Sequence, residues 1–464
     1  MNWQGIFSMT RALNTIALSL STAAVLWLVP GAAPGQQSTP PTDEQLSDPE
    51  VSVVLEGRQR SRFRMAMPAI QREGTLGPQV REAADLLEQT LRTDLDQSGV
   101  FDVQGPTQLS VLTLTGSDER DFELYRSLRN ELLLRADVKQ DQGRLILEGR
   151  VFDLASGKVV LGKRYRGDPS IARRIAHTFA DEIILYFSGR QGLALTSIAF
   201  AADRSGFKEI YLMDADGANQ RPITAHKSIS MSPEWNPNGR EIAYISYYSG
   251  SPSIYLVDLS SGRKTPVITT GSLNISPSFS PDGLKMAFAR SIGDGNTEIF
   301  LCNRDGSALQ QLTHSSGIDT NPAWSPSGRE IAFTSSRTGS PQIYIMDAEG
   351  ANLRRVTFEG NYNDGAAWSP DGTRLVYASR RTGNFDVAVA DIVTLESRLL
   401  TSGGGSNETP SFSPDGRRIL YTLKRTTRDA TTTQIYVMDA TGGNRKQLTS
   451  EGNNSAPVWS GFKQ

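Results

Sequence analysis

The sequence predicts a small N-terminal α/β domain followed by an all-β six-bladed β-propeller. A Pro/Ala-x-aromatic-x-Pro-x-Gly motif recurs with its glycines at 239, 283, 328, 372 and 416, so the spacings are 44, 45, 44 and 44 residues. A second motif, apolar and ending in Asp or Asn, runs in phase and begins at Ile210, Ile254, Ile299, Ile343, Val387 and Ile435. Four short strands in each repeat of this length are typical of a propeller blade.

Each part of the repeat predicts one element of a blade. The Pro-x-Trp segment predicts an innermost strand, and Ser-Pro-Asp-Gly predicts a tight turn, because proline presets φ and glycine accepts positive φ. The apolar runs that follow predict the second and third strands. A threonine comes about ten residues after the end of each second motif, in the region of a short fourth strand: Thr224, Thr269, Thr313, Thr357, Thr401 and Thr449.

The two ends of the repeat array complete each other. The array starts at Thr196 with only three strands before Thr224, and it ends with a truncated copy at 457–460. These two parts together make one blade, so we expect a propeller over 196–464 that is closed by strand exchange between the C-terminus and the first blade. Closure hides strand edges that would otherwise invite aggregation.

Residues 50–190 predict the separate α/β domain. The expected elements are a strand at 62–69, an amphipathic helix at 81–98, a strand at 100–104, a three-strand meander at 132–166 and a helix from Asp168 to Gly189.

The first 49 residues are typical of export. An apolar run at 15–29, followed by small residues, predicts a signal peptide over 1–35 and a Pro/Ser-rich linker over 36–49. An uncleaved membrane anchor is the alternative, although the run is short for a bilayer span of roughly 20 residues. We therefore expect a periplasmic protein that is not inserted in the membrane after cleavage.

Composition excludes several classes of function. The 48 basic and 50 acidic residues give a net charge of −2, so we expect no nucleic-acid partner. Cys302 is the single cysteine, which rules out an intramolecular disulfide, and its place in the repeat predicts a buried thiol.

Catalytic motifs are not found. The Gly-x-Ser-x-Gly nucleophile motif is absent. Residues 157–164 resemble a phosphate loop but end in arginine between strands. Asp214 and Asp216 have calcium-like spacing, yet they occupy a repeat turn. His177 fits a structural role, so we assign no catalytic residue and expect a non-enzyme.

The loops that lead from one blade to the next should surround the channel on one face. They are rich in asparagine and acids, while the loops between second and third strands are basic, which predicts an acidic centre and a basic rim. The central residues are Asn274, Asp319, Asn321, Asn363, Asp364, Asn407, Glu408, Asn453 and Asn454, and the rim residues are Arg337, Arg380, Arg381, Lys424, Arg425 and Arg428. Such a face suits a protein partner. It also leaves open a Ca²⁺ or other cation at the channel mouth, and we expect no other cofactor.

The domain order resembles the TolB family of periplasmic propellers in the Tol–Pal envelope system. The residues that carry the resemblance are the junction Ala-His-Thr-Phe-Ala-Asp-Glu-Ile at 176–183, continuing through Ser188-Gly189 to Ser-Ile-Ala-Phe at 197–200. The segments Glu-Val-Ser-Val-Val-Leu-Glu at 50–56 and Arg-Met-Ala-Met-Pro at 64–68 are similar as well.

The resemblance implies an adaptor, expected as a monomer, that binds the lipoprotein Pal and the inner-membrane protein TolA and supports outer-membrane integrity and envelope constriction at division. It places Pal against Leu273, Asn274, Ser276 and Thr320, within a face completed by Asp319, Asn321, Asn363, Asp364, Asn407 and Glu408. It places TolA against Glu50, Val51, Ser52, Val53, Val54, Leu55 and Glu56, which could add as a strand to a partner. The alternatives are an exported propeller hydrolase or lyase acting on peptides or glycans, and a ligand-binding propeller outside Tol–Pal.

Overall fold

The computed structural model describes residues 62–293 and 295–462. These residues belong to one compact unit that extends from Arg60 to Gln464. The predicted signal peptide (1–35), the linker (36–49) and the segment 50–56 lie outside the described residues. None of the helices in the described ranges has the length and apolar character to cross a bilayer.

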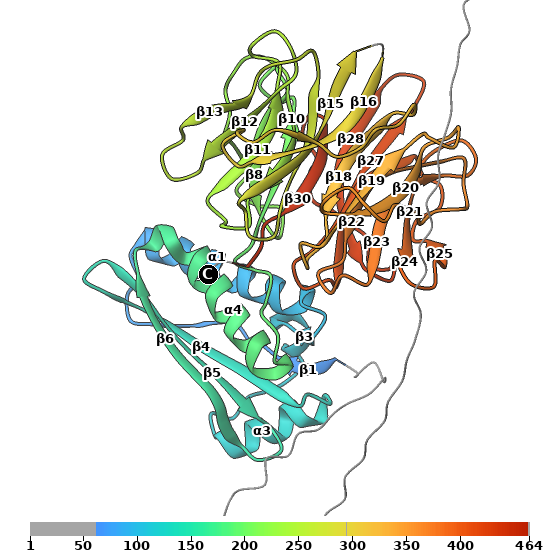
Figure 1. Cartoon of the computed structure of the whole chain (residues 1–464). Coiled ribbons are helices and arrows are strands. Elements are labelled where there is room, and N and C mark those ends of the chain that lie inside the picture. The colour runs from blue at the N-terminus through green and yellow to red at the C-terminus, as the bar shows by residue number, and fades with distance from the viewer. Residues whose placement is uncertain (1–61, 294, 463–464) are drawn as a thin grey trace, which may run out of the picture. The chain divides into compact units, whose positions relative to one another are not determined.

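The N-terminal domain is a mixed sheet, in which β4, β5 and β6 form an antiparallel meander, with two long helices packed on it (Figure 1). Its strands run in the order β3-β1-β4-β5-β6, and β2 pairs with β4. The elements are β1 (Phe63–Ala66), β2 (Gln71–Glu73), α1 (Pro78–Gln97), β3 (Phe101–Gln104), α2 (Pro106–Leu109), α3 (Asp118–Ser127), β4 (Leu132–Asp141), β5 (Arg144–Asp153), β6 (Lys158–Gly167), a 3₁₀ turn (Pro169–Ile171) and α4 (Ala172–Ser188).

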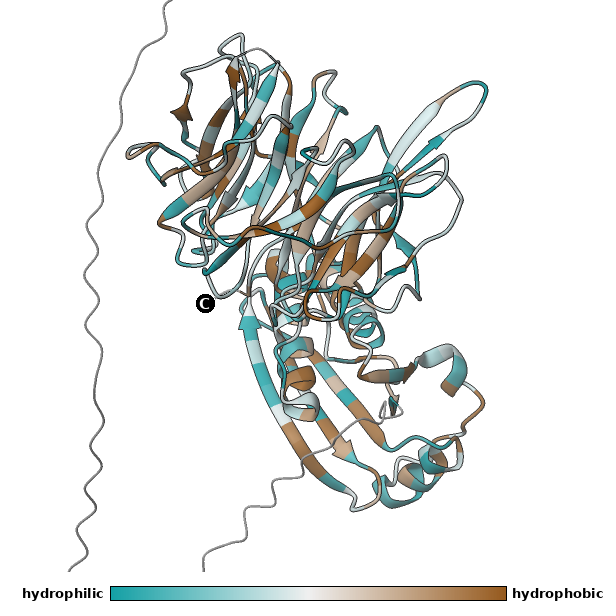
Figure 2. Ribbon diagram, turned by 45° about the vertical axis from the view of Figure 1, so that its right-hand side comes forward, coloured by the Kyte–Doolittle hydropathy of each residue, from teal (hydrophilic) through white to brown (hydrophobic). Residues whose placement is uncertain are grey.

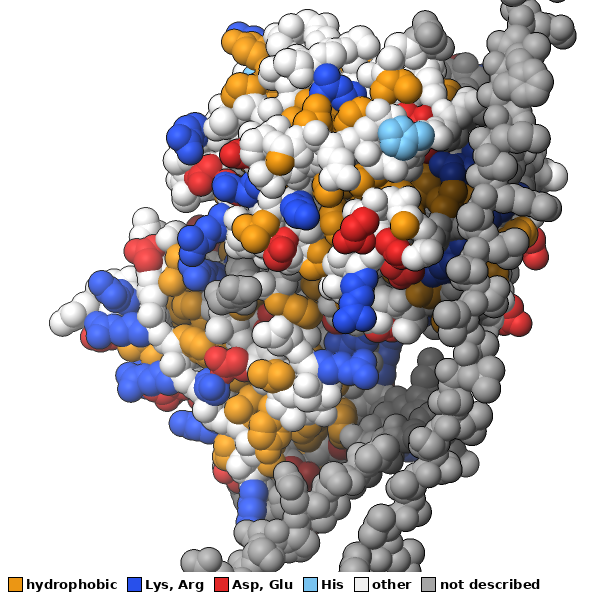
Figure 3. Space-filling view, viewed as in Figure 1, with side chains coloured by type: hydrophobic (Ala, Val, Ile, Leu, Met, Phe, Trp, Pro, Cys, Tyr) orange, Lys and Arg blue, Asp and Glu red, His pale blue; other side chains and the backbone are white. Residues whose placement is uncertain are grey.

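The expected strands, meander and helices of this domain are confirmed. Asp168 accepts a hydrogen bond from the Ser170 N–H at 3.0 Å, and α4 ends at Gly189, whose φ is 68°. The apolar faces of α1 and α4 meet the sheet through residues such as Leu87, Leu91 and Phe179. The sequence did not predict β2, α2 and α3, which are short or mostly polar. On the view of Figure 3, Lys and Arg side chains gather around this sheet.

The second half forms six four-stranded sheets, so the predicted six-bladed propeller is confirmed. Blades are numbered here by their innermost strands. Blade 1 is β10 (Ser230–Trp235), β11 (Glu241–Ser246), β12 (Ser253–Asp258) and β13 (Lys264–Ile268); blade 2 is β14 (Asn274–Phe279), β15 (Lys285–Gly293), β16 (Asn296–Asn303) and β17 (Gln310–Gln311); blade 3 is β18 (Asp319–Trp324), β19 (Glu330–Ser335), β20 (Gln342–Asp347) and β21 (Arg354–Arg355). Blade 4 is β22 (Tyr362–Trp368), β23 (Arg374–Arg380), β24 (Asp386–Asp391) and β25 (Ser397–Leu399); blade 5 is β26 (Ser406–Phe412), β27 (Arg418–Thr426), β28 (Thr431–Asp439) and β29 (Lys446–Gln447); blade 6 is β30 (Asn454–Trp459), β7 (Ser197–Ala202), β8 (Glu209–Asp214) and β9 (Arg221–Pro222).

Blade 6 joins the two ends of the array. The last strand, β30, pairs antiparallel with β7, and Trp459 lies opposite Ile198. The Trp459 indole donates to Thr196 Oγ1 at 2.7 Å, which fixes the chain end to the point where the propeller begins. Because β30 supplies the innermost strand of this blade, no blade is left without its channel-side strand.

Apolar side chains fill the spaces between neighbouring blades. Figure 2 shows hydrophobic residues along the propeller strands and more hydrophilic colouring in many of the connecting loops. Two motif tryptophans also tie blades together: the Trp368 indole donates to Ala323 O of blade 3 at 3.0 Å, and the Trp235 indole donates to Val458 O of blade 6 at 3.2 Å. Cys302 is buried in this core, as predicted, and burial raises the pKa of its thiol to about 12.

A charged cluster connects α1 and α4 to the turn after β8. Arg173 donates to Asp216 at 2.7 Å and lies 3.4 Å from Asp214, while His177 Nδ1 lies 2.6 Å from Asp94. The turn interpretation of Asp214 and Asp216 is correct, but these carboxylates also bind Arg173. The structural role expected for His177 is likewise confirmed, because its ring is buried between carboxylates.

Candidate functional site at the mouth of the propeller channel

Every innermost strand carries a β-bulge at the residue just before its Pro/Ala-x-aromatic motif. The ladder to the second strand shifts register there in all six blades. The bulged residue lies in the left-handed region in each case: Ser232, Ser276, Asn321, Gly365, Thr409 and Ala456, with φ between 49° and 62°. Bulges re-aim side chains and concentrate at functional rims. Here they line up around one channel.

The residue two positions before each bulged residue lies inside its blade instead. This position is filled by Ser230, Asn274, Asp319, Asn363, Asn407 and Asn454, all of them 3% exposed or less. The Asn363 amide, for example, donates to Gln342 Oε1 at 2.7 Å and to Glu359 O at 2.8 Å. Asp319 accepts from Arg337 at 2.8 Å. These side chains hold the loops that surround the channel.

Four of the predicted site residues, Asn274, Asp319, Asn363 and Asn407, therefore do not face the surface. The sequence pattern places them correctly at the loop that leads to the next blade, but the pleat and the bulge turn their side chains into the blade. The predicted residues that remain accessible are Leu273, Ser276, Thr320, Asn321, Asp364 and Glu408, each of them partly exposed.

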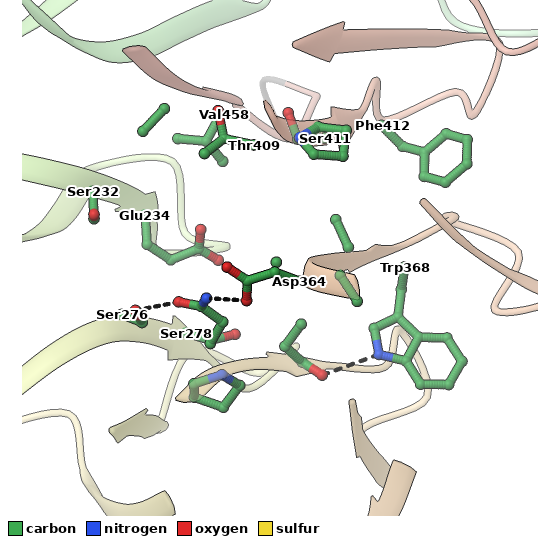
Figure 4. Close-up of a pocket in the computed structure, with 18 of the residues that line it drawn as sticks. Ser232, Glu234, Ser276, Ser278, Asp364, Trp368, Thr409, Ser411, Phe412 and Val458 are labelled. Atoms are coloured by element: carbon green, nitrogen blue, oxygen red, sulfur yellow. Dashed lines mark hydrogen bonds between the residues drawn. The ribbon is translucent and has the colours of Figure 1, made fainter. Parts of the chain in front are cut away.

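Three of these accessible residues form a hydrogen-bonded chain across blades 2, 3 and 4 (Figure 4). Ser276 Oγ donates to Asn321 Oδ1 at 2.5 Å, and Asn321 Nδ2 donates to Asp364 Oδ1 at 2.7 Å. Thr334 Oγ1 also donates to Asp364 Oδ1, at 2.8 Å. The chain fixes polar groups from three blades in one arrangement, which lowers the entropic cost of binding a partner there.

The chain borders a cavity of about 790 Å³ that all six innermost strands line. Ser276, Asn321, Asp364 and Glu408 are among its lining residues. Leu273 and Thr320 are not, although they are partly exposed and come shortly before Ser276 and Asn321 in the chain. The cavity is open to the outside and mixes small apolar side chains with these polar groups. It can receive a protruding segment of another molecule.

Glu234 is a channel residue that the sequence reasoning missed. Its equivalents in the other blades are small or apolar: Ser278, Ala323, Ala367, Ser411 and Val458. Figure 4 shows its carboxyl group directed toward that of Asp364. Burial in the channel raises the pKa of Glu234 to about 8. In the sequence, Glu234 is recognisable because it is the one charged residue at this position of the repeat.

No set of three or more His, Cys, Asp or Glu side chains within 62–293 and 295–462 is placed to hold a metal ion. Glu234, Asp364 and Glu408 supply carboxyl groups to the channel cavity. The arrangement offers hydrogen-bond donors, acceptors and shape complementarity, which are the means of recognition in protein interfaces.

The predicted basic residues lie on the rim, and two of them are neutralised locally. Arg337 pairs with Asp319 at 2.8 Å, and Arg381 pairs with Glu359 at 2.5 Å. Arg428 is exposed between β27 and β28, while Arg380, Lys424 and Arg425 surround a groove in blades 4 and 5.

Two family models match the chain. The model for the TolB beta propeller domain matches residues 186–463, and the model for the TolB amino-terminal domain matches residues 51–160. Together they cover both parts of the described structure.

Named relatives agree with these models. The chain is 34% identical over 265 residues to a protein TolB homolog of Chlorobium chlorochromatii, a match that spans 57% of this chain and 59% of the relative. It is 38% identical over 170 residues to the Tol-Pal system protein TolB of Geobacter metallireducens, spanning 36% and 39% respectively. These matches therefore span less than two thirds of the relatives' lengths. A crystal structure of TolB from Acinetobacter baumannii matches with a TM-score of 0.72 at 27% identity, covering 87% of this chain and 97% of that chain.

Proposed function

Because the chain belongs to the TolB family, we propose that it is a periplasmic, non-enzymatic adaptor of the Tol–Pal envelope system. Its propeller binds a Pal-like outer-membrane lipoprotein through the channel-mouth face. Its segment 50–56 binds TolA, and the two contacts together support outer-membrane integrity and envelope constriction at division.

The observation that carries the proposal is the Ser276–Asn321–Asp364 chain beside an open cavity of about 790 Å³. Polar groups that are already fixed by neighbours are suited to recognising a preformed protein surface. Leu273 and Thr320, which the family resemblance assigns to Pal contact, are partly exposed and come shortly before the cavity-lining Ser276 and Asn321 in the chain. We therefore centre the interface on Leu273, Ser276, Thr320, Asn321, Asp364 and Glu408.

The test is a calorimetric titration of the exported chain with the soluble domain of the host's Pal-like lipoprotein. We expect saturable one-to-one binding that weakens at least tenfold in Leu273→Arg and in Thr320→Trp. The matched control is Leu284→Arg, because Leu284 is 66% exposed in the turn at the other end of β14.

Binding by all variants with equal affinity would move the interface to another face. Absence of binding by the folded wild-type chain would overturn the adaptor proposal and favour a ligand-binding propeller outside Tol–Pal. For the second contact, removal of residues 50–56 should abolish capture of the periplasmic part of TolA and leave Pal affinity unchanged.

A further inference from the structure

The rim of the channel-mouth face carries apolar residues over blades 1 to 3 and cations over blades 4 and 5. In each of these blades, the residue just before the buried position of the innermost strand lies opposite a residue of the second strand or of the loop that follows it. These pairs are Ile229 and Tyr247, Leu273 and Ser291, and Ile318 and Ser336 in blades 1 to 3, followed by Tyr362 and Arg380, and Ser406 and Lys424, in blades 4 and 5. The equivalent pair of blade 6, Asn453 and Asp203, is neither apolar nor cationic. The sequence repeat makes these positions equivalent. Because their side chains differ in polarity and charge, the two sides of the face differ in chemistry.

A groove of about 610 Å³ lies among the cations of blades 4 and 5. The loop at 383–385, the loop at 404–406 and the start of the blade 5 hairpin form its walls. The groove and the channel cavity share Arg380, Phe385 and Glu408 among their lining residues, so they form one continuous depression. These volumes suit an extended chain better than a single small ion.

The hairpin that builds one wall is longer than most of its counterparts. Strands β27 and β28 have 9 residues each, compared with 6 in β11, β12, β19 and β20. The extension pairs Arg425 with Thr432 and Thr426 with Thr431. It therefore carries Lys424 and Arg425 outward beside the channel mouth.

Three cations of this groove are not engaged in ion pairs with any residue that the structure describes. In the part of the chain that the structure describes, Arg380, Lys424 and Arg425 form no ion pair, in contrast to Arg337 and Arg381. The Arg380 guanidinium lies over the rings of Tyr362 and Phe385, 5.0 and 5.2 Å from their centroids. Arg425 Nε donates to Gly404 O at 3.2 Å. Two of the charges are thus held in place by contacts other than ion pairs.

We infer that this groove receives an extended, carboxylate-bearing segment of the protein partner that docks on the channel mouth. The inference rests on the proposed function, and it adds the orientation: the acidic segment lies over blades 4 and 5, and an apolar surface covers Ile229, Leu273 and Ile318. Glu408 in the same groove disfavours a compact phosphate, whereas an extended segment can place its carboxylates beside the three cations and its other side chains against Phe385. Charge complementarity of this kind mainly sets specificity and association rate.

The test compares the wild-type chain with the double variant Lys424→Glu/Arg425→Glu. The matched control is Arg240→Glu/Arg329→Glu, which changes the net charge equally at exposed turns at the opposite end of the innermost strands. Affinity for the soluble domain of the Pal-like lipoprotein is measured at 50 and at 300 mM NaCl. We expect binding at least tenfold weaker in the groove variant at low salt, a smaller salt dependence, and a change of less than twofold in the control.

Each result has a separate meaning. Equal affinity of the groove variant and the wild type would overturn the inference while leaving the proposed function intact, and failure of the wild type to bind would overturn both. Weakened binding of inorganic phosphate alone, with partner affinity unchanged, would identify an anion site and also overturn it. A partner variant with Lys in place of the contacting Asp and Glu should restore binding to the groove variant only.

Discussion

His177 Nδ1 lies 2.6 Å from Asp94 Oδ2, so a buried ion pair joins helix α4 to helix α1. The other ring nitrogen lies 3.8 Å from Asp214, in the turn after β8. Burial opposes the charged ring, but the carboxylates of Asp214 and Asp94 outweigh it and raise the pKa of His177 to about 9. The charged imidazole therefore connects the N-terminal helices to the propeller.

This pair predicts a pH-dependent stability. A histidine whose folded-state pKa exceeds its unfolded value near 6.5 stabilises the fold fully below pH 6.5, and that stabilisation is lost as pH rises through about 9. Calorimetric melting of the wild type and of His177→Gln should therefore differ most at pH 6 and least at pH 10. His314→Gln, at an exposed position, is the control. A wild-type advantage that did not shrink with pH would contradict the charged state of His177.

The sequence repeat predicted the six blades because each blade needs the same turn and the same apolar strands. It also located the threonines after the second motif, but it did not predict what they do. In five blades the threonine hydroxyl accepts a backbone N–H of the third strand and lies within hydrogen-bond distance of an acidic or amide side chain. These contacts depend on strand register, which the spacing of the motifs does not fix.

Thr357 gives a test of these threonine hydrogen bonds inside the blade. Its hydroxyl accepts from the Ile343 N–H at 2.9 Å and donates to Gln342 Oε1 at 2.8 Å. Thr357→Val removes both bonds inside the blade and should cost about 1–3 kcal/mol of unfolding free energy. Thr269→Val is the control, because Thr269 is the exposed counterpart in blade 1. Equal urea unfolding curves for the two variants would show that the hydrogen bonds of Thr357 contribute nothing to stability.

The candidate site shows the same division between what spacing can and cannot predict. The loops were placed on one face because strand direction follows from the repeat. Which side chains of those loops reach the surface depends on the bulge in each innermost strand. The sequence pattern therefore does not separate Asn274 from Ser276, although only Ser276 lines the channel cavity. Glu234 does not follow from the repeat, because the equivalent residues of the other blades are small or apolar.

Glu234 predicts a second pH effect on stability. It arises because burial disfavours the charged form of this side chain, whereas ion pairing favours the charged form of His177. Burial raises its pKa to about 8 in the folded chain, so the folded state holds a proton that the unfolded state loses above about pH 4.5. Wild-type stability should therefore fall between pH 5 and pH 8 relative to Glu234→Gln and then level off. Thermal melting across this range measures the difference, and a constant difference would mean that Glu234 is ionised in the channel.

Gly365 and Gly405 differ in why glycine is favoured. Gly365 has only a positive φ, whereas Gly405 has a positive φ and also packs closely against a neighbouring strand. Gly365 has a φ of 62°, and an added Cβ would meet no atom within 4 Å. Because Ala456 adopts the same backbone conformation in blade 6, Gly365→Ala should cost only about 1 kcal/mol, the price of a left-handed alanine. Gly405 has a φ of 133°, and its Cβ would collide with the Lys424 carbonyl. Gly405→Ala should therefore lower the melting temperature considerably more and disturb the groove wall. A Gly405→Ala variant as stable as Gly365→Ala in urea titration would contradict the close packing of this loop against β27.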